Sequence, residues 1–87
     1  MQAKELTISN ADGLRASKAA MFVQVAGRFA SQILVEKGNK KINAKSIMGV
    51  LSLGVQKGDK IYVFANGKDE LEAIAAMEEL VVGGFGE

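Results

Sequence analysis

Four segments of the chain carry the apolar and polar patterning of β-strands. Residues 4–9 (KELTIS) alternate with the period of a half-buried strand, and residues 60–66 (KIYVFAN) are rich in β-branched and aromatic side chains. Residues 32–36 (QILVE) and 40–43 (KKIN) flank a Lys-Gly-Asn tract that suits a tight reversal. These last two segments are therefore predicted to pair as antiparallel strands.

Two other segments carry the helical period, in which apolar residues recur at steps of three and four. Residues 19–30 show this period with polar residues on the opposite face, which predicts an amphipathic helix. Asp69 and Glu72 have the spacing of a capping box, and apolar side chains recur at helical steps from there to Val81. A last helix is therefore predicted, and the glycine-rich residues 83–86 are expected to fray at its end.

A shorter segment, residues 46–53 (SIMGVLSL), is predicted to form a two-turn helix. Ser46 and Gly54 are residue types typical of the start and end of a helix. Two turns cannot bury five large apolar side chains against one sheet, so only Val50 and Leu53 are expected in the core. The other apolar residues are expected to stay partly exposed: Ile47, Met48 and Leu51.

The element order β-α-β-β-α-β-α predicts an α+β fold with one domain over residues 1–87. The helices can bury their apolar stripes together only against one face of a four-stranded antiparallel sheet, which gives an open-faced β-sandwich. Tyr62 and Phe64 are expected on the open face, because their parity is opposite to that of the neighbouring aliphatic residues. They either mark the surface of a weak homodimer or are ordinary exposed apolar side chains.

Composition excludes several function classes. The chain has 11 basic and 10 acidic side chains, and a net charge of +1 disfavours direct binding of nucleic acid. It has no cysteine and no histidine, which removes disulfides, thiolate nucleophiles, imidazole bases and the commonest zinc ligands. We therefore expect no metal, no cofactor and no enzymatic activity. No apolar run approaches the roughly 18 residues of a membrane span, so a soluble cytoplasmic protein without membrane contact is expected.

Ser46 on its own is most simply a plain helix cap, but its predicted position would also suit a phosphate. As a helix cap, its hydroxyl lies beside backbone N–H groups that have no partner within the helix, and these groups would hold a phosphate. Gly49 occupies the third helical position, so no carboxylate competes for those donors. Lys45, with Lys40 or Lys41, is expected to moderate the added negative charge.

Two motifs resemble the HPr family, the histidine-containing phosphocarriers of the bacterial sugar phosphotransferase system. They are NAKSIMGVLSLG at residues 43–54 and the frame GL-x-A-xx-AA-x-FVQ at residues 13–24. The resemblance covers essentially the whole chain and implies the HPr-like fold. The KSIMGV core is typical of the Gram-positive type, and it implies that Ser46 is phosphorylated by HPr kinase/phosphorylase.

The first motif departs from the family at its reactive position. The family pattern is G-[IL]-H-A-R-P-A, whereas this chain has Arg15 at the place of the histidine, Ser17 at that of the arginine and Lys18 at that of the proline. A guanidinium has no free lone pair with which to attack phosphorus, and a serine phosphate ester is too stable for a rapid relay. The phosphocarrier activity is therefore expected to be absent.

The loss of the histidine makes the chain similar to the Crh branch of the family, the catabolite-repression HPr proteins. This resemblance implies that the Ser46-phosphorylated form binds a CcpA-type transcription repressor and acts as its corepressor in carbon catabolite repression. The residues it implies for partner binding are Arg15, Ser17, Ile47, Met48 and Leu51. The alternative is an HPr variant or decoy that binds enzyme I or enzyme II domains without phosphotransfer. Arg15 is either a solvated side chain or a contact to an acidic partner residue or to phosphorylated Ser46.

Overall fold

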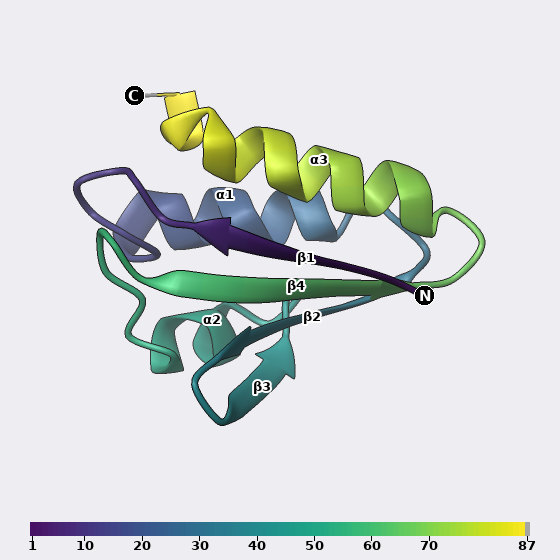
Figure 1. Ribbon diagram of the computed structural model, residues 1–87, viewed down its shortest axis with the longest axis horizontal. Coiled ribbons are helices and arrows are strands. Elements are labelled where there is room, and N and C mark those ends of the chain that lie inside the picture. The colour runs from purple at the N-terminus through teal and green to yellow at the C-terminus, as the bar shows by residue number, and fades with distance from the viewer. Residues whose placement is uncertain (87) are drawn as a thin grey trace.

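The computed structural model describes residues 1–86 as a sheet with its helices on one side (Figure 1). The elements, in chain order, are β1 (Gln2–Thr7), α1 (Ala16–Ala26), β2 (Gln32–Lys37), β3 (Lys40–Asn43), α2 (Ile47–Ser52), β4 (Lys60–Asn66), α3 (Glu70–Val82) and the 3-10 turn η1 (Gly84–Gly86). This order confirms the predicted β-α-β-β-α-β-α arrangement and its α+β class.

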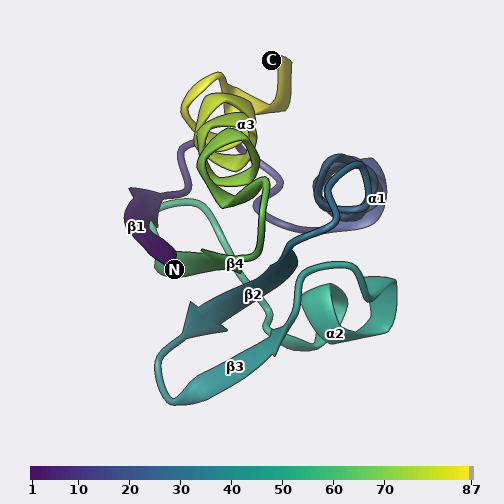
Figure 2. The ribbon, with the colours of Figure 1, turned by 90° about the vertical axis from the view of Figure 1, so that its right-hand side faces the viewer.

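The four strands form one antiparallel sheet in the order β1-β4-β2-β3. Figure 2 shows α1, α2 and α3 on one side of this sheet, with the other side uncovered. The core between the two layers contains the inward-facing aliphatic residues of the strands and the apolar stripes of the helices. Its largest fully buried side chains include Phe22, Ile8, Leu14, Ile33, Ile61 and Met77.

The open face contains the two aromatic residues expected there. Tyr62 is 43% exposed and Phe64 is half-buried, whereas Ile61, Val63 and Ala65 between and beside them are buried. The Tyr62 hydroxyl donates a 2.7 Å hydrogen bond to Glu5 on the paired strand β1. This bond, with the nearby negative charge, raises the pKa of Tyr62.

Two predicted element boundaries were wrong. The helix predicted at residues 19–30 runs from Ala16 to Ala26. It ends at Gly27, whose amide donates to the Val23 carbonyl at 2.9 Å. The strand predicted at residues 4–9 runs from Gln2 to Thr7 because β4 pairs with those six residues. Ile8 keeps its buried position, but it bonds to the loop before β4 instead of to the strand.

The capping box predicted before α3 is also wrong. Asp69 makes no side-chain bond to its own helix; its carboxylate accepts hydrogen bonds from the Ala30 amide (2.8 Å), the Ser31 amide (2.9 Å) and the Ser31 hydroxyl. The helix start is held instead by Glu70, which accepts from the amide of Gly67 at 3.1 Å. The Ser31 hydroxyl and then the Ala30 amide are the main causes that lower the pKa of Asp69 to about 2.

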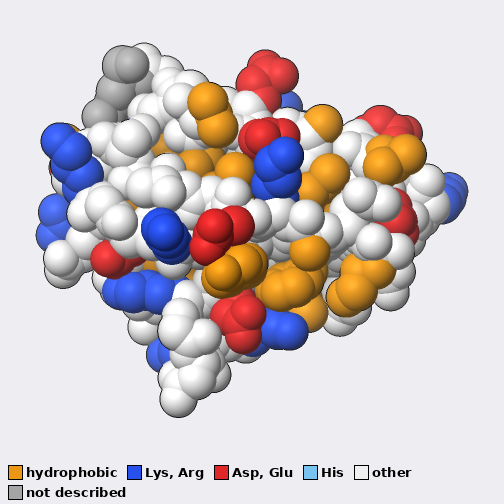
Figure 3. Space-filling model, in the orientation of Figure 1, with side chains coloured by type: hydrophobic (Ala, Val, Ile, Leu, Met, Phe, Trp, Pro, Cys, Tyr) orange, Lys and Arg blue, Asp and Glu red, His pale blue; other side chains and the backbone are white. Residues whose placement is uncertain are grey.

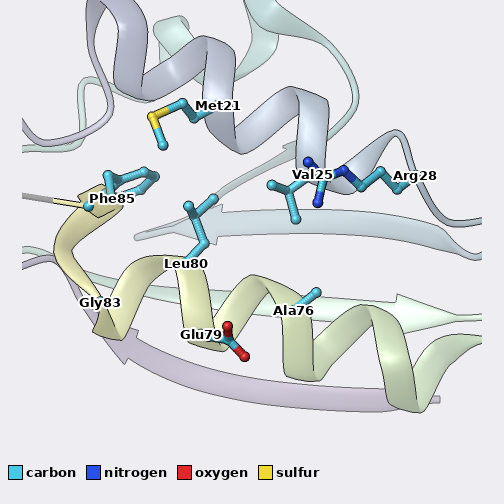
Figure 4. A pocket seen from close by; sticks show the side chains of 9 residues that line it. Met21, Val25, Arg28, Ala76, Glu79, Leu80, Gly83 and Phe85 are labelled. Atoms are coloured by element: carbon cyan, nitrogen blue, oxygen red, sulfur yellow. The ribbon is translucent and has the colours of Figure 1, made fainter.

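The glycine-rich tail packs against the helices, which corrects the prediction that it frays. Phe85 is only 3% exposed, and it adopts a left-handed backbone conformation with φ 58°. Figure 4 shows its ring beside Met21 of α1 and Leu80 of α3, at a hollow of about 500 Å³ between the two helices. The ring thus closes the end of the apolar layer where α1 and α3 meet.

Candidate functional site

Ser46 caps α2 as the sequence predicted. It has an extended backbone conformation, its hydroxyl oxygen accepts a 3.2 Å hydrogen bond from the Gly49 amide, and its carbonyl accepts from the Val50 amide at 2.9 Å. A Cβ at Gly49 would lie 3.3 Å from both the Ser46 hydroxyl and the Ile42 side chain. Gly49 therefore lets the helix start pack closely on β3, and it leaves the half-exposed Ser46 hydroxyl without a competing carboxylate.

The lysines expected to surround Ser46 have other partners in the structure. Lys45 donates to the Phe29 carbonyl at 2.7 Å, and Lys40 donates to the Ser52 carbonyl at the far end of α2, at 3.1 Å. Lys41 lies on the open face, above an aromatic ring of β4. Alternation along β3 explains the last two placements, because neighbouring strand residues point to opposite faces of the sheet. Each of these lysines thus has a partner other than Ser46 in the unphosphorylated chain, and their effect on a charge at Ser46 stays a prediction.

Apolar side chains of α2 divide between core and surface as predicted. Val50 is fully buried and Leu53 is 7% exposed. The other three form what we call the α2 patch, and their exposed fractions are 39% for Ile47, 73% for Met48 and 41% for Leu51. An exposed cluster of this kind, adjacent to the Ser46 cap, is a surface that a partner protein can cover. Methionine suits such a surface because its side chain adapts to different shapes.

Arg15 and Ser17 are both exposed at the start of α1. Arg15 precedes the first helical residue without capping the helix, and its Nε donates to the Asp12 carbonyl at 3.1 Å. Ser17 lies in the first turn. Between them, Ala16 has φ 50°, a backbone conformation that side chains other than glycine rarely adopt and that costs about 1–3 kcal/mol. No signal in the sequence predicted this strained residue.

Arg15 also lines a polar hollow of about 310 Å³, together with Ala11, Asp12, Gln56 and Lys57. Ser46 is not among the residues that line it. The amide of Gln56 donates to Asp59 at 2.8 Å and Lys37 forms an ion pair with the same carboxylate at 3.0 Å, and in that order these contacts lower the pKa of Asp59. The hollow therefore borders a loop that its own hydrogen bonds hold in place, and Arg15 is presented next to that loop.

The described part of the chain offers no group of three or more acidic, imidazole or thiol side chains that could hold a metal ion. None of the helices described in residues 1–86 is both long enough and apolar enough to cross a membrane.

Comparison with known proteins places this arrangement in a family. Residues 2–82 match the family model described as "PTS HPr component phosphorylation site". The HPr-like protein Crh of Halalkalibacterium halodurans is 47% identical over 77 residues, which cover 88% of this chain and 92% of that protein.

Two solved structures share the fold. HPr-C-His from Thermoanaerobacter tengcongensis superimposes with a TM-score of 0.98 at 53% identity, covering 100% of this chain and 98% of that one. Crh of Bacillus subtilis, described as a dimer with a swapped domain, gives a TM-score of 0.77 at 42% identity and covers 97% of each chain. With a family match over nearly all of its length and relatives of this similarity, the chain belongs to the HPr family of the phosphotransferase system.

Proposed function

We propose that this chain is a regulatory member of the HPr family in which Ser46 is the phosphorylated residue. HPr kinase/phosphorylase adds the phosphate, and the phosphorylated form acts as corepressor of a CcpA-type repressor in carbon catabolite repression. The observation that carries the proposal is the position of Ser46, a partly buried residue at the start of α2 beside the exposed α2 patch. The match to the phosphorylation-site family model and the similarity to Crh support it.

The proposed modification needs only the Ser46 hydroxyl from this chain. Its Oγ forms a bond to the γ-phosphorus of ATP held by the kinase, the bond from that phosphorus to the ADP oxygen breaks, and the hydroxyl proton is released. The product carries about −1.5 to −2 charges at Ser46. The surface next to the apolar α2 patch therefore becomes strongly anionic. The Gly49 amide, which now donates to the hydroxyl, remains a donor to the modified side chain.

A phosphohistidine relay is not part of the proposal. HPr family proteins are phosphocarriers or regulators, and this chain contains no histidine at all. Arg15 has no lone pair for attack on phosphorus, and a phosphate ester on Ser17 would transfer its group slowly. We therefore propose that the chain is not an enzyme and not a carrier, and that it acts only by binding.

The kinase reaction provides the direct test. Incubation of the protein with HPr kinase/phosphorylase and ATP is expected to add one phosphate, detected by intact mass and located at Ser46 by peptide mapping. The Ser46→Ala variant should stay unmodified. Ser52→Ala is the matched control, because Ser52 lies on the same short helix and its hydroxyl bonds to the Gly49 carbonyl at 2.6 Å. Absence of phosphate on the wild-type protein contradicts the proposal.

Repressor binding tests the proposed partner surface. We propose that the α2 patch contacts the repressor, with Arg15 and Ser17 at its margin. Met48→Ala is expected to weaken binding of the Ser46-phosphorylated protein, whereas Leu71→Ala, an equally apolar change at a 62% exposed residue of α3, should not. Arg15→Ala measures the contribution of the guanidinium to repressor binding. If the affinity for the repressor is unchanged, Arg15 is not part of the binding surface.

A second candidate function is favoured by the exposed Arg15 beside its hollow. In this alternative the chain is a decoy that occupies enzyme I or enzyme II domains without passing on phosphate. Binding to these domains by the unphosphorylated protein, measured by calorimetry, would favour the decoy. Transfer of phosphate from phosphoenolpyruvate and enzyme I to the chain would contradict both proposals.

We also propose that the chain forms a weak homodimer. The dimer described for the related Crh of Bacillus subtilis supports this proposal, and so do the exposed Tyr62 and the half-buried Phe64 on the open face.

A further inference from the structure

The sulfur chemistry of this chain is confined to its methionines. The sequence has four methionines, and it has no cysteine, no tryptophan and no histidine. A cysteine thiolate is the usual target of a peroxide, and in its absence the methionine thioether is the sulfur that accepts an oxygen atom. A two-electron oxidant such as hydrogen peroxide is therefore expected to act on this chain by forming methionine sulfoxide.

The four methionines differ widely in their exposure to solvent. Met77 is fully buried in the core, and Met21 is half-buried beside the Phe85 ring (Figure 4). Met48 is 73% exposed and Met1 is 71% exposed. Because an oxidant must reach the sulfur atom, Met48 and Met1 are expected to react before the two methionines that the fold covers.

Of the two exposed methionines, Met48 is the one on the proposed partner surface. The amino group of Met1 pairs with Glu70 at 2.8 Å, at the start of α3, and Figures 1 and 2 both show the N-terminus well away from α2. Met48 lies on α2 two residues after Ser46, and its side chain neighbours that of Leu51, three residues further along the helix. An oxygen atom added to Met48 therefore enters the α2 patch itself.

The surroundings of a sulfoxide decide how much it changes the surface. Figure 3, which views the molecule with the strands in front of α1 and α2, shows hydrophobic side chains lying among acidic and basic groups. A polar group added to such a mixed surface stays in water and changes little. In the α2 patch three exposed apolar side chains follow one another on a single short helix, so a polar group there interrupts the area that a partner would cover.

We propose that Met48 is an oxidation site at which a peroxide switches off repressor binding by the Ser46-phosphorylated chain. This regulation rests on the proposed function, because it acts on the same patch. A lone pair of the Met48 sulfur forms a bond to one peroxide oxygen, the O–O bond breaks, and a proton passes to the departing hydroxide, which gives the sulfoxide and one water. The sulfur loses two electrons and the peroxide gains them. Methionine sulfoxide reductases remove the oxygen as water with electrons from two thiols, so the switch is reversible.

The two modifications of α2 then have opposite effects on the partner surface. The phosphate on Ser46 adds negative charge beside the patch, whereas the sulfoxide on Met48 leaves the charge unchanged and makes the patch polar. When an apolar partner surface covers Met48, the sulfoxide oxygen loses water and gains no donor in exchange. The lost apolar contact and the unpaired oxygen together are expected to weaken repressor binding about tenfold or more. The fold should be unaffected, because the Met48 side chain is mostly in solvent.

Repressor binding before and after oxidation tests this switch. The protein is first phosphorylated on Ser46 by the kinase, then treated with dilute hydrogen peroxide, desalted and titrated into the repressor in a calorimeter. Peptide mapping is expected to show one added oxygen at Met48 and at Met1 before any at Met77. The affinity for the repressor is expected to fall about tenfold and to return after treatment with methionine sulfoxide reductase and a dithiol.

Met48→Leu is the matched variant, because leucine keeps an apolar side chain of similar volume without the sulfur. It is expected to bind the repressor within about twofold of the wild type and to ignore the peroxide, although Met1 is still oxidised. Three results would overturn the switch and leave the proposed function standing: oxidation of Met77 before Met48, unchanged binding by wild type fully oxidised at Met48, or an equal loss of binding by peroxide-treated Met48→Leu. An unoxidised, phosphorylated wild type that does not bind the repressor would overturn the proposed function and the switch together.

Discussion

Replacing Gly13 by alanine is expected to destabilise this fold strongly. Gly13 has φ +62°, and a Cβ there would lie 2.3 Å from the Val55 carbonyl oxygen and 2.8 Å from the Gln56 Cα. The loop approaches this closely because the Leu14 amide donates to the Val55 carbonyl at 3.1 Å and Asn10 donates to the Gly13 carbonyl at 2.9 Å. The neighbouring atoms are backbone, so they cannot move aside as a flexible side chain would.

The magnitude follows from two separable costs. An alanine in the left-handed conformation costs about 1–2 kcal/mol, and forcing a methyl group into a packed site costs typically another 1–3 kcal/mol. Gly13→Ala is therefore expected to lose about 2–5 kcal/mol of the free energy of unfolding. Gly38 provides the matched control, because it has the same φ of +62° and no atom within 4 Å of its virtual Cβ. Gly38→Ala should show only the first cost.

Urea unfolding followed by far-ultraviolet circular dichroism measures both variants. Each kcal/mol corresponds to about 4–8 °C in the melting temperature of a domain of this size, so a melting curve gives an independent check. A difference of less than about 0.5 kcal/mol between the variants would refute the reasoning, because the steric cost would then be negligible.

Three further predictions concern particular side chains. The pKa of Asp69 is lowered from 3.8 to about 2, so its ionised form stabilises the fold above about pH 4. This contribution is lost as the pH falls toward 2. Asp69→Asn should therefore make the urea midpoint of unfolding depend less on pH between about 4 and 2. Met77→Ala, at a fully buried residue, should cost about 2–5 kcal/mol of unfolding free energy, whereas Met48→Ala, at a 73% exposed residue, should change it by less than about 0.5 kcal/mol in the same urea assay. Glu5→Gln should lower the pKa of Tyr62, which its hydrogen bond to Glu5 now raises; because the chain has one tyrosine, ultraviolet absorbance of the phenolate reports this directly.

Local patterns carried most of the fold prediction. The period of a strand or helix depends on neighbouring residues only, so the seven main elements and their order could be predicted from the sequence. The cap at Ser46 and the exposure of Met48 also follow from local rules, since a helix of two turns has only one buried stripe. The part of the candidate site around α2 was therefore largely predictable.

Long-range contacts account for what could not be predicted. Asp69 has the capping-box spacing, but its carboxylate accepts hydrogen bonds from the amides of Ala30 and Ser31 instead of from its own helix. Those two residues are nearly forty positions away in the sequence. Lys45 is adjacent to Ser46 in sequence, yet its ammonium reaches the Phe29 carbonyl. The glycines around Phe85 predict a fraying tail, but the ring of Phe85 is buried at the end of the helical layer. Each outcome depends on tertiary neighbours that no short window contains.

The edges of the sheet determine what kind of aggregate the molecule avoids. An exposed edge strand is a template on which further chains can add without limit, as in amyloid. Here β3 is only four residues long and begins with Lys40 and Lys41, and β1 carries Lys4 and Glu5 near its middle. Short, charged borders of this kind discourage fibril growth. Crowding should therefore not drive this protein into open-ended polymers.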